Sequence, residues 1–159
     1  MIDLPLNKLL FFDLETVGIE KDLPTLKKNR PELARLFESY LDWFIRKYPD
    51  QEGKTPEEIF VNKATLVAEF SKIIVASFSF ITPSDEVHTQ TFAEDDEKEL
   101  LLKVRDLLNK VQKLDFHLCG HNIKFFDIPT LGKRFLTNNI LPPKILPSYE
   151  TKPWEVKAL

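Results

Sequence analysis

The chain has 159 residues, of which 43% are hydrophobic, and this length and apolar content suit one domain with one substantial core. Its net charge of -3 at pH 7 argues against strong, indiscriminate binding of nucleic acid through a general positive field. The single cysteine, Cys119, cannot form an internal disulfide, no secretory signal peptide is visible, and no stretch approaches about 18 consecutive apolar residues, so we predict a soluble, cytoplasmic protein without a membrane partner.

The first predicted element is a strand over about residues 8 to 15, in which two carboxylates interrupt an apolar run. Asp13 and Glu15 are two residues apart, so an extended backbone directs both side chains to one face of a sheet. Together they could bind a hard cation, which would remove the cost of burying them unpaired. The alternative is that the strand ends at Phe12 and that Asp13 to Thr16 form a solvated turn.

A helical segment is predicted next. Pro31 begins an amphipathic helix with one apolar face, formed by Leu33, Leu36, Phe37, Tyr40, Leu41, Phe44 and Ile45. The turn-forming residues 48–53 end it, and Thr55 with Glu58 forms a capping-box start for a second helix to about Val67. These helices form an insertion over about residues 19–70.

The remainder of the chain alternates strands and helices. Residues 72–81 and 87–92 predict an antiparallel hairpin, and Asp95 or Asp96 starts a helix with an apolar inner face that extends to Val111. A short strand near Phe116 and a helix over about residues 128–138 follow. The acidic run Glu94 to Glu97 is expected to favour the helix dipole and to stay solvated.

A second polar motif follows the short strand. Residues 120–131 read Gly-His-Asn-Ile-Lys-Phe-Phe-Asp-Ile-Pro-Thr-Leu. Asp127 is a candidate metal ligand or a helix N-cap, and Asn122 either contacts a substrate or completes the turn after Gly120. Phe126 could press against a terminal base or pack in the core. A lone histidine beside glycine is more often structural, so His121 is left outside the site.

With these two motifs in this order, the chain resembles the DEDD superfamily of 3′ to 5′ exonucleases. The spacing Asn-x-x-x-Phe-Asp is similar to that of the exonuclease domains of family B DNA polymerases, and the nearest group is the stand-alone bacterial predicted exonucleases related to them. The resemblance extends to residues 63–66, 69–73 and 152–155. It implies a ribonuclease H-like α/β fold: a mixed sheet with flanking helices in a single domain over residues 1–159, interrupted by the helical insertion after the first strand.

The resemblance also implies a site and a reaction. Two divalent ions, Mg²⁺ or Mn²⁺, would hydrolyse nucleic acid from a single-stranded 3′ end, with DNA as the expected substrate. Asp13 would bridge both ions, and Glu15 would lie beside the attacking water. Asp127 would complete the coordination of the second ion. Thr16, Asn122 and Phe126 are the implied substrate contacts.

One sequence motif of the superfamily is missing. The superfamily has a third motif, Tyr-x-x-x-Asp or His-x-x-x-x-Asp on a last helix, and this sequence has no aspartate after Asp127, while Tyr149 is followed four places later by Pro153. We therefore expect a truncated exonuclease that lacks its last helix and has little activity alone. The alternative is a naturally short protein whose activity is lost or is supplied by a partner. The surface left by that helix could form a homodimer. The alternatives are a catalytically silent nucleic-acid-binding or protein-interaction module and, less favoured, an endonuclease of the ribonuclease H type.

Overall fold

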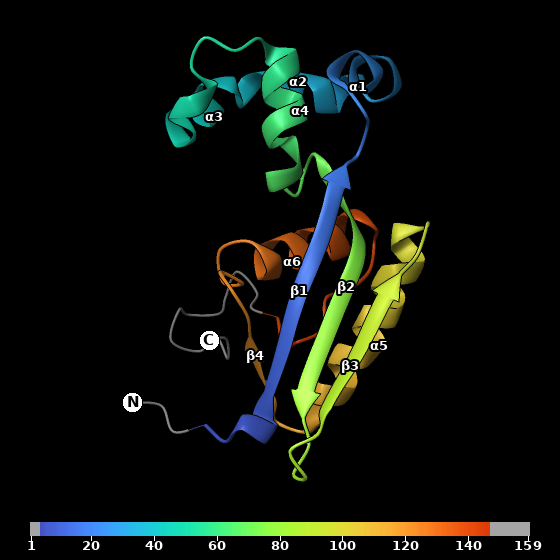
Figure 1. The fold of residues 1–159 in the computed structure, drawn as a ribbon. Helices are drawn as coiled ribbons and strands as arrows, with labels where there is room; N and C mark the ends of the chain where they lie inside the picture. Colours follow the sequence, from blue (N-terminus) through green and yellow to red (C-terminus); the bar gives the residue numbers. More distant parts are fainter. Residues whose placement is uncertain (1–3, 147–159) are drawn as a thin grey trace. The chain divides into compact units, whose positions relative to one another are not determined.

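A four-stranded mixed sheet organises the larger part of the computed structural model, which describes residues 4–146 (Figure 1). The strand order is β3-β2-β1-β4, with β1 at Leu9–Gly18, β2 at Ser71–Ile81, β3 at Val87–Ala93 and β4 at His117–Cys119. β4 is parallel to β1, and β3 is antiparallel to β2. The predicted α/β class and the predicted hairpin are therefore confirmed.

The side chains of β1 alternate between two faces, as its sequence predicts. Leu10, Phe12 and Leu14 are at most 5% exposed and belong to the main hydrophobic core. Asp13 and Glu15 point to the other face and are exposed. Because β1 continues to Gly18, the alternative of a solvated turn after Phe12 is wrong.

Two helices pack on the buried face of this sheet. The first, α5 (Glu97–Lys113), begins at the N-cap Asp96 and buries Leu100, Val104 and Leu108, as predicted. The second, α6 (Asp127–Thr137), contributes Leu131 and Phe135 to the same core. Both helices lie behind the sheet in Figure 1, so the view faces the side on which Asp13 and Glu15 lie.

Residues Thr16–Lys72 form a second compact unit, separate from the unit that contains the sheet core. Its bounds are close to those of the predicted helical insertion. The unit contains helices α1 at Leu23–Asn29, α2 at Pro31–Ser39, α3 at Leu41–Lys47 and α4 at Pro56–Lys63. Aromatic rings form its centre: Phe37 is fully buried and meets Phe60 and Phe70 edge to face, with ring centroids 5.0 and 5.4 Å apart.

The single amphipathic helix predicted from Pro31 is wrong, because two helices occupy that segment. The chain leaves the regular helical pattern at Tyr40, whose amide donates to the Phe37 carbonyl at 2.9 Å, and the Ser39 hydroxyl donates to the Leu36 carbonyl at 2.7 Å. These contacts replace the hydrogen bonds that would continue the helix. The capping box at Thr55 and Glu58 is confirmed, although α4 ends at Lys63.

One carboxylate of the acidic run is not solvated, contrary to expectation. Glu97 as a whole, backbone included, is half-buried, and its side chain is only 9% exposed. It accepts hydrogen bonds from the Ile73 amide at 2.8 Å, from Arg134 Nε at 2.8 Å and from Asn138 Nδ2 at 3.0 Å. The ion pair with Arg134, a residue far along the chain on α6, compensates the burial of this charge.

Tyr149, the matching segment 152–155 and the region of the expected third motif lie outside the described residues. The missing last helix and the homodimer therefore stay predictions. Within residues 4–146, none of the helices is long and apolar enough to span a membrane.

Candidate functional site

A hydrogen bond joins the two sequence motifs. The backbone amide of Leu14, which lies between Asp13 and Glu15, donates to Asp127 Oδ1 at 3.1 Å, although these residues are 113 positions apart. Asp127 is 3% exposed and is the first residue of α6. The N-cap position is Phe126, with no side-chain capping bond, so Asp127 is not the N-cap that the sequence allowed.

The strand topology explains why this contact forms. β4 is short, and its last residue, Cys119, pairs with Phe11. Beyond that point the edge of β1 has no β4 residue to bind it, and Asp127 supplies the acceptor that the Leu14 amide needs. The end of β4, the middle of β1 and the start of α6 thus meet at one place.

Gly120 holds the start of the connecting loop against β1. A Cβ atom on this residue would lie 2.6 Å from the Phe12 carbonyl oxygen and 2.5 Å from the Cγ2 atom of Ile123. The backbone oxygen cannot move without disturbing β1 beside Asp13. Glycine is therefore required here for close packing.

We expect Gly120→Ala to lower the free energy of unfolding by about 1–3 kcal/mol, the usual cost of overpacking. Gly132 on α6 is the matched control, because a Cβ atom there would meet nothing within 4 Å. Gly132→Ala should be neutral or should stabilise the protein by about 0.5–1 kcal/mol, since alanine favours a helix over glycine. Urea unfolding of both variants measures the difference, and equal stabilities would contradict the role assigned to Gly120.

The environment of Asp127 is unfavourable for a negative charge. Burial raises the pKa of its carboxyl above the ordinary value, and the nearby negative charge of Asp13 adds to this effect. The hydrogen bond from Leu14 and the proximity of His121 act in the opposite direction without reversing the shift. The fold therefore keeps a carboxylate in a place where its ionisation costs free energy, which is typical of functional sites.

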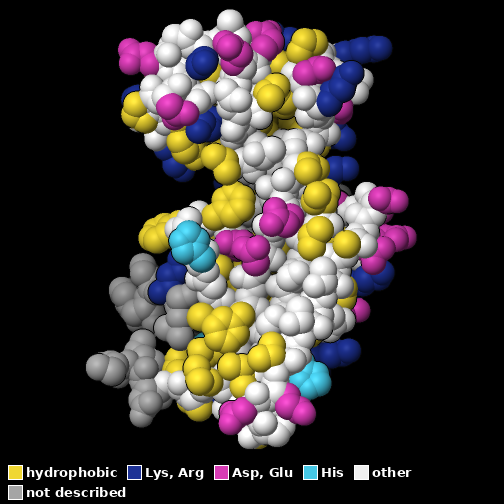
Figure 2. All heavy atoms as spheres, in the orientation of Figure 1, with side chains coloured by type: hydrophobic (Ala, Val, Ile, Leu, Met, Phe, Trp, Pro, Cys, Tyr) yellow, Lys and Arg dark blue, Asp and Glu magenta, His cyan; other side chains and the backbone are white. Residues whose placement is uncertain are grey.

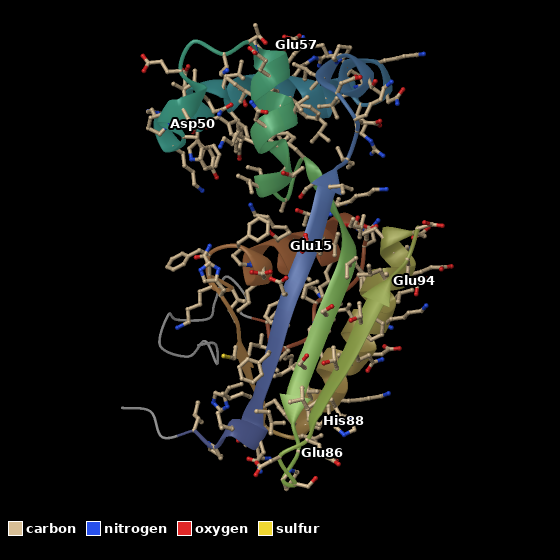
Figure 3. All side chains as sticks on the ribbon, in the orientation of Figure 1. Glu15, Asp50, Glu57, Glu86, His88 and Glu94 are labelled. Atoms are coloured by element: carbon tan, nitrogen blue, oxygen red, sulfur yellow. The ribbon has the colours of Figure 1, made fainter. Side chains whose placement is uncertain are left out.

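Asp13, Glu15 and Asp127 are oxygen donors, the type that Mg²⁺ and Mn²⁺ prefer. Asp13 and Glu15 are exposed on the sheet face seen in Figure 2, where acidic side chains gather over β1; Figure 3 labels Glu15 on the same strand. Within residues 4–146, no three His, Cys, Asp or Glu side chains already stand close enough together to hold a metal ion. The chemistry of the donors suits the ion, and bringing all three onto one ion requires adjustment of their side chains.

The three predicted substrate contacts have different surroundings. Asn122 is exposed and has a φ of 57°, a left-handed conformation that asparagine tolerates, and its carbonyl accepts bonds from the amides of Phe125 and Phe126. It therefore completes the turn, while its side chain faces solvent. Phe126 is half-buried. The Thr16 hydroxyl donates to the Thr65 carbonyl at 3.1 Å within the second unit.

The structure adds two residues to the surroundings of the carboxylates. His121 is exposed and close enough to Asp127 to affect its pKa. Phe125 is 84% exposed and lies two residues before Asp127. Phe125 and Phe126 are adjacent and both precede α6, so the sequence alone does not show which of the two rings is exposed.

Comparison of the chain with protein-family models, with curated proteins and with solved structures found no match in any of the three.

Proposed function

We propose that this chain is a metal-dependent 3′ to 5′ exonuclease domain of the DEDD type with a ribonuclease H-like fold, acting on the single-stranded 3′ end of DNA in the cytoplasm. The observation that carries the proposal is the bond between the Leu14 amide and Asp127. It supports the view that the two motifs form one site, because it brings the second-motif aspartate beside the strand that carries Asp13 and Glu15.

In this proposal the three carboxylates hold Mg²⁺ or Mn²⁺. Bound ions would activate a water molecule, orient the scissile phosphate and offset the charge on the departing 3′ oxygen. Asp13 and Glu15 extend from a rigid strand into solvent, where a nucleic-acid end can approach. Asp127 is fixed at the edge of that strand by its bond to Leu14. Without cations, these carboxylates would repel a phosphate backbone, which argues against a binding module that needs no metal.

The experiment is an assay of metal binding and hydrolysis on the same protein. Mn²⁺ binding is followed by electron paramagnetic resonance, and release of terminal nucleotides is followed on a 3′-labelled single-stranded oligonucleotide. We expect Mn²⁺ binding together with slow, stepwise release, because the third motif of the resembled superfamily is not found in this sequence. Asp13→Ala should abolish the release and weaken Mn²⁺ binding.

Glu86→Ala is the matched control, because it removes an exposed carboxylate from the turn of the β2–β3 hairpin (Figure 3). This variant should retain binding and hydrolysis. Oligonucleotide binding without Mn²⁺ binding or hydrolysis would replace the proposal with the silent-module alternative. Cleavage within an RNA–DNA hybrid would instead favour an endonuclease of the ribonuclease H type.

A further inference from the structure

The strand β3 forms one edge of the sheet and pairs on one side only. It pairs with β2 over its whole length, from Ile81 with Val87 to Val75 with Ala93, without a break in register. Within residues 4–146, no second strand pairs with β3, and no backbone hydrogen bond reaches its outer side. Every residue of β3 except Phe92 is exposed, and β3 is the right-hand strand of the sheet in Figure 1. A row of backbone donors and acceptors is therefore open to a further chain.

The hairpin turn shows which backbone groups of β3 point outward. The Thr82 amide donates to the Glu86 carbonyl at 2.9 Å, and from there hydrogen-bonded pairs alternate with non-hydrogen-bonded pairs along β2 and β3. Thr89 and Thr91 therefore belong to non-hydrogen-bonded pairs. Their hydroxyl groups lie 2.8 and 2.9 Å from serine hydroxyls of β2, in agreement with the short separation of such pairs. By the same alternation, the amides and carbonyls that point outward belong to Val87, Thr89, Thr91 and Ala93.

The composition of β3 leaves this edge unprotected. Edge strands of soluble proteins usually avoid pairing through charged residues, proline, a bulge or a very short length. β3 has seven residues, Val-His-Thr-Gln-Thr-Phe-Ala, and contains no Lys, Arg, Asp, Glu or Pro, although 30% of the whole chain is charged. Its regular register with β2 excludes a bulge. An extended chain can therefore add to the sheet here through main-chain hydrogen bonds.

The outward groups of β3 are complementary to those of a second β3. When two copies lie antiparallel about a twofold axis at Gln90, Thr89 lies opposite the partner's Thr91, and Val87 lies opposite the partner's Ala93. All four residues direct their backbone groups outward, so each of these pairs is a hydrogen-bonded pair. A second copy of the chain thus fits the edge without any change in the pattern of the strand.

The distribution of charge also permits two copies to approach. No charged side chains oppose each other between Val87 and Ala93, because β3 has none. Just outside this segment, Glu86 would lie opposite the partner's Glu94, and the ion pair of Glu94 with Lys103 offsets part of that repulsion. A twofold contact of this kind is the commonest way in which identical chains associate.

We propose that two copies of this chain associate antiparallel through β3 and join their four-stranded sheets into one continuous sheet. This association is independent of the proposed exonuclease function. It also differs from a homodimer on the surface left by the last helix, because it uses a strand edge within residues 4–146. Since β2 separates β3 from β1, the pairing leaves Asp13 and Glu15 of each copy accessible.

The first test places charge at the twofold axis. In Gln90→Lys, two ammonium groups oppose each other across the axis, which should raise the dissociation constant of the dimer by at least about tenfold. Gln90→Glu should do the same with two carboxylates. An equimolar mixture of the two variants should restore the dimer, because opposite charges then meet. Sedimentation velocity over a range of concentrations measures each sample, and association in the mixture shows that both variants are folded.

The second test separates backbone pairing from side-chain contact. Thr89→Pro removes an amide that points outward, and proline is tolerated at such an edge position. Thr89→Val is the matched control, because both substitutions lose the hydroxyl contact with Ser79 and only proline loses the amide. Thr89→Pro should be monomeric at concentrations at which Thr89→Val and the wild type are dimers. In the wild type, the amides of Thr89 and Thr91 should exchange with solvent more slowly above the dissociation constant than below it.

Several results would overturn the proposal. One is a wild type that stays monomeric up to about 1 mM, a concentration at which even a weak contact is populated. A dimer that persists in both Gln90→Lys and Thr89→Pro would place the interface elsewhere, with the surface left by the last helix as the candidate. Equal loss of the dimer in Thr89→Val and Thr89→Pro would assign the contact to the hydroxyl group. A mixture of the two Gln90 variants that does not associate would contradict the twofold axis at this residue.

Discussion

Replacement of Glu97 by alanine is expected to lower the free energy of unfolding of the sheet unit by about 3–5 kcal/mol, the usual cost of breaking a buried ion pair. The side chain of Arg134 is 4% exposed and that of Glu97 is 9% exposed, so water cannot replace the carboxylate easily. The loss also removes the acceptor of the Ile73 amide, which is part of β2, and a partner of Asn138. One side chain therefore stabilises β2, α5 and α6 together.

Urea unfolding measures this effect, and amide hydrogen exchange of Ile73 assigns it to the sheet unit. Glu99→Ala is the matched control, because Glu99 is an exposed acid in the same first turn of α5, and it should change stability by less than about 1 kcal/mol. The double variant Glu97→Gln with Arg134→Met removes both charges and keeps an oxygen for Ile73. It should be closer to the wild type than Glu97→Ala, whereas equal destabilisation would show that the charge left on Arg134 in Glu97→Ala does not cause the loss of stability.

Whether an element is predicted correctly from the sequence depends on which interactions determine it and on how far apart in the sequence the interacting residues are. Alternation along β1 and the capping box at Thr55 and Glu58 depend on neighbouring residues, and both were predicted correctly. The helix from Pro31 was predicted as one element because its apolar residues recur regularly. Its division at Tyr40 depends on local hydrogen bonds of Ser39 and Tyr40 that hydrophobic periodicity does not reveal.

Long-range pairing explains the remaining differences. Glu97 has the sequence signature of a solvated helix start, and only the approach of Arg134 from α6 makes its burial favourable. The bond from the Leu14 amide to Asp127 likewise joins residues that no local pattern connects. The family resemblance implied that Asp127 shares a site with Asp13 and Glu15, but it did not predict this bond. Phe125 was not among the predicted site residues, because a pair of adjacent phenylalanines does not show which ring faces solvent.

The largest effect at the candidate site is expected for Asp127. Replacement by asparagine or alanine should weaken Mn²⁺ binding by at least about 10-fold, because removing a ligand costs no less than removing a residue that merely supports one. The two substitutions should differ in their effect on stability. Alanine leaves the Leu14 amide without its acceptor and should lower the free energy of unfolding by about 1–3 kcal/mol.

Asparagine keeps an oxygen that can accept the Leu14 bond and removes the charge whose burial raises the pKa of Asp127. At neutral pH, without metal, this variant should be more stable than the wild type by about 0.5–1 kcal/mol, as is common where a functional site is strained. The sign depends on pH. Because the folded-state pKa is above the unfolded value, the wild type gains stability as the pH falls through the folded-state pKa, and the advantage of asparagine should disappear there.

Urea unfolding at neutral and at acidic pH, together with Mn²⁺ titration followed by electron paramagnetic resonance, measures both properties of Asp127→Asn. A variant that is more stable and has lost the ion would show that Asp127 is retained for binding at a cost in stability. A variant that is less stable at every pH and binds Mn²⁺ normally would assign Asp127 a purely structural role at the edge of β1. It would also remove the observation on which the exonuclease proposal rests, because the contact between the two motifs would then serve folding alone.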